Sequence, residues 1–183
     1  MAMNRFLKIS GNYSQWVVYK KSVLICDVTE LFIKRALNPP SRTIDQMRQA
    51  ARSCKQNIVE GVSDKTVSAE MCIKLLGVAR GSVRELLEDY QDYLRQHEME
   101  IWTKDDPRTV ATRNFCRNHT DPKEFCEKCK LRTDETVANI MITLIRQMDA
   151  MLAKVLSSIE LEFIRDGGIK EAMTRARKSA RGY

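Results

Sequence analysis

The sequence predicts an all-α protein, an antiparallel up-and-down four-helix bundle with an inserted segment between helices three and four and a basic C-terminal tail. Three observations lead to this prediction. Four long stretches place apolar residues three and four positions apart, which is the period of an amphipathic helix. The 183 residues include only seven glycines and four prolines, too few for the turns of an all-β protein. Hydrophobic residues make up 43% and charged residues 30%, a balance typical of globular domains.

The first two expected helices occupy residues 14–37 and 42–60. Each carries an apolar stripe, formed by Val17, Leu24, Val28 and Leu31 in the first and by Ile44, Met47, Ala51, Cys54 and Ile58 in the second. The Pro39-Pro40 pair ends the first helix because proline cannot continue it. Gly61 stands where a C-terminal cap of the second helix belongs.

The third and fourth expected helices occupy residues 67–98 and 134–165. The fourth is the most apolar, and its stripe is wide enough to contact two neighbours and a second subunit. Residues 99–133 are too long for a bundle loop, so we expect them to have local structure of their own. The predicted organisation is therefore a bundle over residues 1–166 and a tail over 167–183.

Positive charge is concentrated at the C-terminus. The chain has 31 Lys and Arg against 24 Asp and Glu, a net charge of +7 that favours polyanionic partners. The tail contributes +4 of this charge, and its candidate nucleic-acid-binding residues are Lys170, Arg175, Arg177, Lys178 and Arg181. Such a cluster neutralises phosphates and releases their counterions. It equally fits a solvated terminus that keeps the protein in solution.

The sequence lacks the signatures of an enzyme. It contains no glycine-rich phosphate loop and no nucleophile elbow. A di-iron bundle site needs Glu-x-x-His, but Leu94 and Cys116 stand three positions before His97 and His119. The acidic cluster of the third helix has helical spacing and is expected to be a solvated or arginine-paired surface; it comprises Glu85, Glu88, Asp89 and Asp92. We therefore expect no catalysis.

We expect the protein to be cytoplasmic and without a membrane partner. The first ten residues contain no apolar segment typical of a signal peptide. The longest uncharged apolar stretch, residues 136–145, is too short to cross a bilayer. Without an export signal, the six cysteines are better interpreted as thiols or metal ligands than as disulfides.

Two ligand pairs lie in the inserted segment. Cys116-x-x-His119 is followed after six residues by Cys126-x-x-Cys129, and three thiolates with one imidazole suit tetrahedral zinc. The Asp121-Pro122 dipeptide between them is a turn signal that would bring the pairs together. The other interpretation is four unconnected residues in a loop, kept reduced. Zinc is the one cofactor that the sequence indicates.

A motif spans the expected second and third helices. Its residues are Arg48, Ala51, Asn57, Glu60, Gly61, Gly81, Ser82 and Glu85. Two glycines four residues apart, Gly77 and Gly81, cost helix stability and indicate a close helix contact, which we expect against Ala50 and Ala51. The motif as a whole is expected to serve bundle architecture.

This motif resembles the bacterial four-helix-bundle family named for 23S rRNA intervening-sequence proteins, which includes the accessory variability proteins of diversity-generating retroelements. The resemblance covers residues 13–94, and the long fourth helix and basic tail are similar to the longer four-helix-bundle suffix members. Val59 departs from the alanine usual in the family, and the inserted segment is a second departure.

The resemblance implies a basic homopentamer. In the retroelement branch of the family, the accessory proteins bind nucleic acid, RNA or DNA, and a reverse transcriptase, whereas the other branches have no established activity. The leading hypothesis is therefore a non-enzymatic oligomeric protein that binds nucleic acid, or a partner that processes it, through basic surfaces. The alternative is a structural or protein-interaction module whose insertion folds around zinc.

Overall fold

The computed structural model describes residues 16–63, 69–166, 174 and 177–181, and helices are the only regular secondary structure among them. The prediction of an all-α protein is confirmed. The helices are α1 (Val17–Ala36), α2 (Arg42–Ser63), α3 (Ala69–Gln96), α4 (Pro107–Asn118), α5 (Pro122–Lys130) and α6 (Asp134–Asp166). No helix in these ranges is both long enough and apolar enough to span a membrane.

The four longest helices coincide with the four stretches of helical periodicity, with one instructive difference at the end of α2. The helix continues to Ser63, so Gly61 lies inside it and is not its C-terminal cap. Gly61 is buried, and a Cβ there would lie 3.2 Å from the Cβ of Leu75 on α3. The glycine therefore allows α2 and α3 to approach closely.

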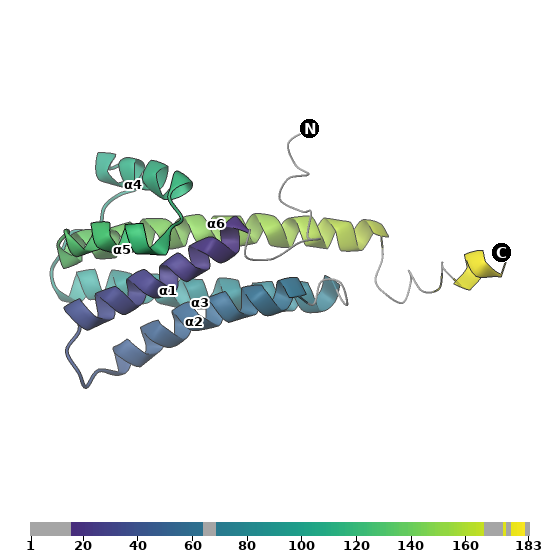
Figure 1. The fold of residues 1–183 in the computed structure, drawn as a ribbon, viewed down its shortest axis with the longest axis horizontal. Helices are drawn as coiled ribbons and strands as arrows, with labels where there is room; N and C mark the ends of the chain where they lie inside the picture. Colours follow the sequence, from purple (N-terminus) through teal and green to yellow (C-terminus); the bar gives the residue numbers. More distant parts are fainter. Residues whose placement is uncertain (1–15, 64–68, 167–173, 175–176, 182–183) are drawn as a thin grey trace.

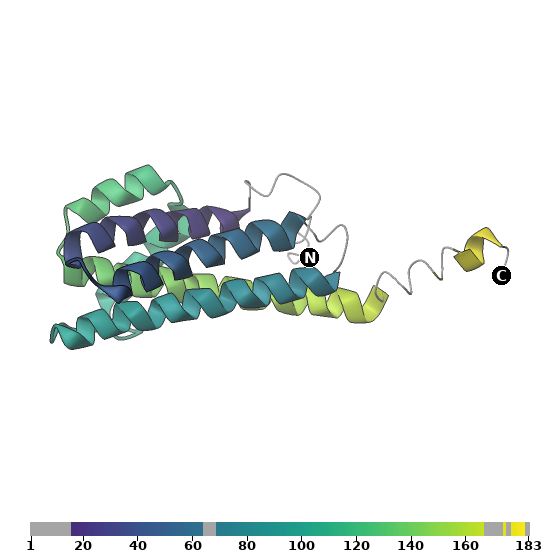
Figure 2. The same cartoon turned by 90° about the horizontal axis from the view of Figure 1, so that it is seen from below.

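The long helices pack side by side, α2 against α3, α3 against α6, and α1 against both α2 and α6 (Figures 1 and 2). Their apolar stripes meet in one continuous core. Its largest fully buried side chains include Leu24, Phe32, Met47, Leu86, Tyr90, Met141 and Leu144. Phe32 contacts the rings of Tyr90 and Tyr93 with centroid distances of 4.9 and 4.8 Å. The hydroxyl of Tyr90 donates to Thr29 Oγ1 at 3.1 Å, which satisfies its buried polar atom.

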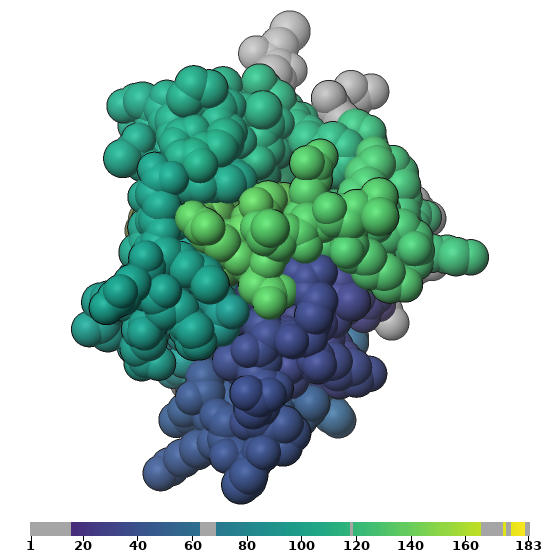
Figure 3. Space-filling view, turned by 90° about the vertical axis from the view of Figure 1, so that its left-hand side faces the viewer, coloured from purple at the N-terminus to yellow at the C-terminus, as the bar shows by residue number. Residues whose placement is uncertain are grey.

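The segment between α3 and α6 forms two short helices, each started by an Asp-Pro dipeptide. Asp106 accepts a hydrogen bond from the backbone N–H of Arg108, and Asp121 accepts one from Glu124, so both aspartates are N-caps followed by proline in the first turn. Helix α5 packs on α1, and α4 packs on α6. In the space-filling view, the green α4–α5 region and the purple-to-blue α1–α2 connection flank the start of α6 (Figure 3).

The two ends of the molecule differ in thickness (Figures 1 and 2). The closed end contains α4, α5, the C-terminal halves of α1 and α3, and the start of α6. The open end contains the C-terminal end of α2, the N-terminal end of α3 and the C-terminal end of α6, which extend past the start of α1. Apolar side chains are exposed there: Met71 is 44%, Leu161 66% and Ile164 77% accessible.

Candidate functional site

The basic tail is described only in part. Arg177, Lys178 and Arg181 are exposed, and a short helical turn connects them, with the Arg181 N–H bonded to the Arg177 carbonyl at 3.2 Å. Lys170 and Arg175 lie outside the described residues. The described part of the tail therefore offers three accessible cations within five positions.

A second basic feature lies on the surface formed by α3 and α6. Arg80 and Arg84, one turn apart on α3, both hold Asp149 of α6, with Nε–Oδ1 distances of 2.7 and 2.8 Å. Burial alone would raise the pKa of Asp149, but the hydrogen bonds from Arg80 and Arg84 outweigh it and lower that pKa. Because one carboxylate serves two guanidinium groups, the cluster keeps a net positive charge. Arg84 is largely exposed and therefore faces solvent.

Gly77 and Gly81 do not form the expected contact with Ala50 and Ala51. Both glycines are exposed, and a Cβ at either position would meet nothing within 4 Å. The expectation failed because these positions share the outer face of α3, whereas Ala79 and Val83 face the core. The close α2–α3 contact lies at Gly61 instead.

Two of the remaining motif residues connect neighbouring helices. Arg48 bonds Glu30 of α1 with an Nε–Oε2 distance of 2.9 Å. Ser82 and Ser53 link α3 to α2 through their hydroxyls at 2.9 Å.

Other motif side chains act within one helix or face solvent. The Asn57 amide donates to the Ser53 carbonyl at 2.9 Å, and Ala51 is buried. Glu60 and Glu85 are exposed.

The three cysteines of the predicted metal loop come from α4 and α5 and face the same part of the interior. Cys116 and Cys129 are buried, and Cys126 is half-buried. Burial, followed by the charges of Cys126 and Cys116, raises the pKa of Cys129 to about 12, against a smaller opposing effect of Arg35 and Arg132. Burial also raises the pKa of Cys116 to about 11.

His119, the fourth predicted ligand, caps the end of α4. Its ring stacks on Phe115 with a centroid distance of 3.9 Å, and its Nδ1 lies 2.9 Å from the Phe115 carbonyl oxygen. A carbonyl accepts only, so Nδ1 carries the proton in this bond and Nε2 keeps a lone pair. Zinc-bound histidines commonly have this arrangement. Within the described ranges, however, no three His, Cys, Asp or Glu side chains form a group that could hold a metal ion.

Sequence reasoning missed a lysine beside this cluster. Lys21 of α1 is only 2% accessible, and its Nζ donates to the Cys116 carbonyl at 2.5 Å and to Gln147 Oε1 at 3.3 Å. Burial lowers the pKa of Lys21, and the neighbouring Cys116 opposes that shift. Lys21 stands four residues after Val17 and three before Leu24, so it interrupts the apolar stripe expected for the first helix, and that interruption is the sequence signal that could have revealed a buried lysine.

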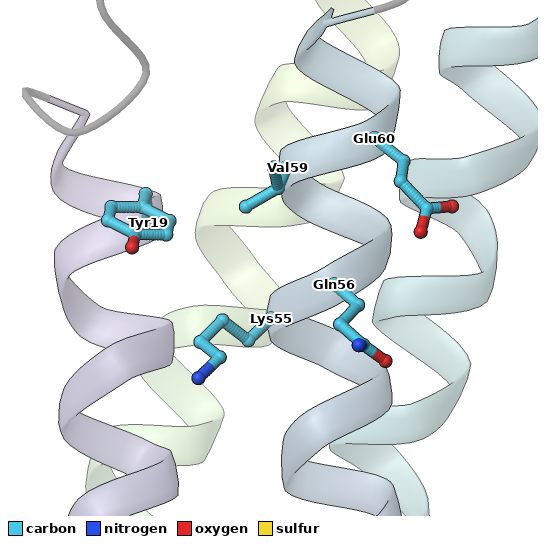
Figure 4. A pocket seen from close by; sticks show the side chains of 5 residues that line it. All are labelled: Tyr19, Lys55, Gln56, Val59 and Glu60. Atoms are coloured by element: carbon cyan, nitrogen blue, oxygen red, sulfur yellow. The ribbon is translucent and has the colours of Figure 1, made fainter.

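A shallow depression lies between α1 and α2, lined by Tyr19, Lys55, Gln56, Val59 and Glu60 (Figure 4). Lys55 extends toward α1, whereas Glu60 extends toward α3, so the two charges do not converge (Figure 4). The depression contains no pair of groups arranged for acid–base or nucleophilic chemistry.

The acidic residues of α3 are not arranged as a pair for chemistry either. Asp92 is bonded to Arg95 at 2.6 Å, and Glu85 and Glu88 are exposed. Burial, followed by the charges of Asp92 and Glu85, raises the pKa of Asp89 to about 6.

Comparison of the chain with models of protein families, with curated proteins and with solved structures finds no match.

Proposed function

We propose that this chain is a non-enzymatic, oligomeric four-helix-bundle protein that binds nucleic acid through basic surfaces. In this proposal α1, α2, α3 and α6 form an antiparallel up-and-down bundle over residues 1–166, with α4 and α5 as an insertion. The pairing of the long helices and the resemblance of the α2–α3 motif support it.

One observation carries the nucleic-acid proposal: Arg80 and Arg84 both donate hydrogen bonds to the carboxylate of Asp149. Arg80 and Arg84 are held in place by Asp149, so they present guanidinium groups from a rigid helix. Guanidinium groups suit phosphate oxygens, and contacts of this kind fix position without reading base sequence. Arg177, Lys178 and Arg181 add a second basic surface. The partner is therefore a phosphodiester backbone, and RNA and single-stranded DNA are the forms to test first.

Self-association is the second part of the proposal. The exposed Leu161 and Ile164 lie near the end of α6, and the exposed Met71 lies near the start of α3. A second copy would remove this apolar surface from water. The resemblance makes the assembly a pentameric ring, in which five copies of each basic surface add up to avidity. Light scattering coupled to size exclusion should then give about five times the 21.1 kDa chain mass.

Binding of labelled structured RNA and single-stranded DNA at two salt concentrations tests the function. We expect affinity to fall steeply with salt because phosphate neutralisation releases counterions. Arg80→Met with Arg84→Met should weaken binding, while Lys123→Met with Lys128→Met, on α5, serves as the charge-matched control. Absence of micromolar binding at low salt, or binding that ignores salt, would overturn the proposal.

A zinc-stabilised insertion is the second candidate function, in which the α4–α5 region docks a protein partner. The spacing of the two ligand pairs and the contact of His119 Nδ1 with the Phe115 carbonyl favour it. The ligands would be Cys116, His119, Cys126 and Cys129. Metal analysis of protein purified without chelator should find about one zinc per chain. If zinc is absent and adding it leaves the fold unchanged, this candidate is wrong.

A further inference from the structure

The outer face of α3 carries two glycines that packing within the chain does not explain. Gly77 and Gly81 are exposed, and a Cβ at either position would meet nothing within 4 Å. A glycine inside a helix lowers helix stability relative to alanine. Of the described glycines, only Gly61 lies where a Cβ would crowd a neighbouring side chain. The two exposed glycines therefore suit a close approach by something outside the chain.

These glycines are the middle of a row of residues, three and four positions apart, that we call the α3 stripe. It comprises Glu70, Lys74, Gly77, Gly81, Arg84 and Glu88. Helix α6 has a row with the same spacing, the α6 stripe, which comprises Arg146, Ala150, Ala153, Ser157, Glu160 and Ile164. All twelve residues are exposed except Ala153, which is half-buried. Residues at this spacing share one side of a helix, so each stripe has small side chains in its middle and charged ones on either side.

Four charges on the two stripes have no opposite charge beside them. Lys74 and Glu88 on α3, and Glu160 on α6, form no ion pair within the described residues. Arg146 donates to a neutral group, Gln91 Oε1, at 3.2 Å. Each stripe has its cation first along the chain and its carboxylate second. Because α3 and α6 run in opposite directions (Figure 2), the two orders of charge are complementary when the stripes face each other.

The level at which the stripes would meet follows from contacts within one chain. Arg84 bonds Asp149 and Arg146 bonds Gln91, which sets how α3 and α6 are offset along the bundle. In a closed ring whose axis runs along the bundle, copies are not shifted along that axis, so the same offset holds between neighbours. It places Gly81 opposite Ala153, Gly77 opposite Ser157, Lys74 opposite Glu160 and Glu88 opposite Arg146. Small residues then meet small ones, and both pairs of charges have opposite signs.

We infer that the α6 stripe of one copy of this chain docks on the α3 stripe of the next copy. This inference rests on the self-association proposed above and names its two surfaces. The small residues allow the two helix axes to approach closely, and Ile164 then lies beside the start of the neighbour's α3, where Met71 is exposed. Arg84 faces Ala150, whose short side chain leaves the ion pair with Asp149 in place. Because the two surfaces differ, the contact is heterologous and repeats until a ring closes.

Charge reversal in the full chain tests this docking. Lys74→Glu places a carboxylate opposite Glu160 at every contact, and Glu160→Lys places an ammonium opposite Lys74. At a concentration where the parent chain is assembled, we expect each single variant to lower the mass measured by light scattering to that of one chain, 21.1 kDa. Lys74→Glu combined with Glu160→Lys restores opposite charges and should restore the assembly. Lys123→Glu, at an exposed position on α5, is the matched control and should leave the mass unchanged.

The outcomes separate this inference from the self-association on which it rests. If the parent chain assembles and neither single variant changes its mass, the docking of these two stripes is wrong and self-association stands. If the single variants dissociate but the double variant does not reassemble, the pairing of Lys74 with Glu160 is wrong. If the parent chain is a monomer, self-association is wrong and the inference fails with it. Circular dichroism confirms that each variant is folded.

Discussion

The closed and open ends of the molecule are built differently. At the closed end, α4 and α5 are fastened to the long helices by buried or partly buried polar contacts as well as by apolar packing. At the open end, α2, α3 and α6 extend past the start of α1, and Met71, Leu161 and Ile164 are exposed. The first arrangement completes an interior within one chain, whereas the second leaves apolar surface that another molecule can cover.

Polar attachment points explain how a segment with few apolar residues can still be ordered. Asn139 of α6, only 1% accessible, accepts from the Trp102 N–H at 2.8 Å and donates to the Glu100 carbonyl at 2.8 Å. Arg35 of α1 donates to Asp134 and to the Cys129 carbonyl. With Lys21, these side chains position the connection after α3 and the short helices. Directional bonds thus fix what hydrophobic periodicity alone would leave undetermined.

Phe32→Ala should have the largest effect, because Phe32 has no accessible surface and packs between two tyrosines of α3. Removing a buried aromatic ring typically costs about 3–5 kcal/mol of unfolding free energy, through lost transfer energy and a cavity. Urea denaturation of the full chain measures the change. Leu131→Ala, at a side chain that is 86% accessible, is the control and should fall within about 0.5 kcal/mol of the parent. A small loss at Phe32 would mean that the closed-end core repacks readily.

Asn139→Ala tests the polar attachment and should cost about 1–3 kcal/mol, because the Trp102 N–H and Glu100 carbonyl lose their side-chain partner. Hydrogen exchange should show faster opening in residues 99–118 than in α2. Asn114→Ala, on the exposed side of α4, is the matched control and should be nearly neutral. Equal protection in both variants would show that apolar packing alone holds the insertion.

The long helices were predictable because each buries a wide apolar stripe, and that pattern is visible in the sequence. Residues 42–63 illustrate the limit: the stripe located α2, but Gly61 was interpreted as a cap because a glycine that ends a helix and one that admits a neighbour look alike. The same ambiguity misplaced Gly77 and Gly81, although both lie off the apolar stripe that contains Ala79 and Val83.

The short helices, and the polar contacts that hold them to the long helices, were harder to predict. Residues 107–118 and 122–130 have too few apolar residues for a clear stripe, although Asp106-Pro107 and Asp121-Pro122 are recognisable helix starts. Lys21 lies 95 residues from Cys116 in the chain, so its role depends on the tertiary fold. The four predicted metal ligands lie on α4 and α5 or at the end of α4, but they do not form a group of three that could hold a metal ion within the described residues.

The ion pairs of Arg80 and Arg84 with Asp149 link α3 to α6 between the two ends of the molecule. They should make the stability of the chain depend on pH. The pKa of Asp149 is lower in the folded chain, so its contribution is complete above the unfolded pKa near 3.9 and disappears as pH falls through the folded value. Asp149→Asn should lower the free energy of unfolding by about 1 kcal/mol at pH 7, a value that allows for the solvent exposure of Arg84. Near pH 2 the substitution should have almost no effect. Thermal denaturation across this range measures the difference. A loss independent of pH would point to packing instead of charge.

Asp89, on the same helix α3, should make stability change with pH in the opposite direction. Its folded pKa of about 6 exceeds the unfolded value, so stability should fall as pH rises from about 4 to 6. Asp89→Asn should therefore stabilise the chain at pH 7 by up to about 1 kcal/mol, allowing for screening, and have no effect at pH 4. If both aspartates gave the same pH profile, the contrast between a paired and an unpaired carboxylate would be wrong.

Gly81→Ala should have the smallest effect on the stability of a single chain. The sign of that change tests whether the outer face of α3 is uncovered. A Cβ at Gly81 meets nothing within 4 Å, so alanine should raise helix stability by about 0.5–1 kcal/mol. Gly61→Ala should gain less or lose stability, because its Cβ must displace Leu75. If a second copy packs against this face of α3, the same substitution should stabilise the monomer yet weaken the assembly. Denaturation combined with light scattering separates these effects: a gain in stability with unchanged assembly would place the subunit contact elsewhere, on the exposed apolar residues of α6.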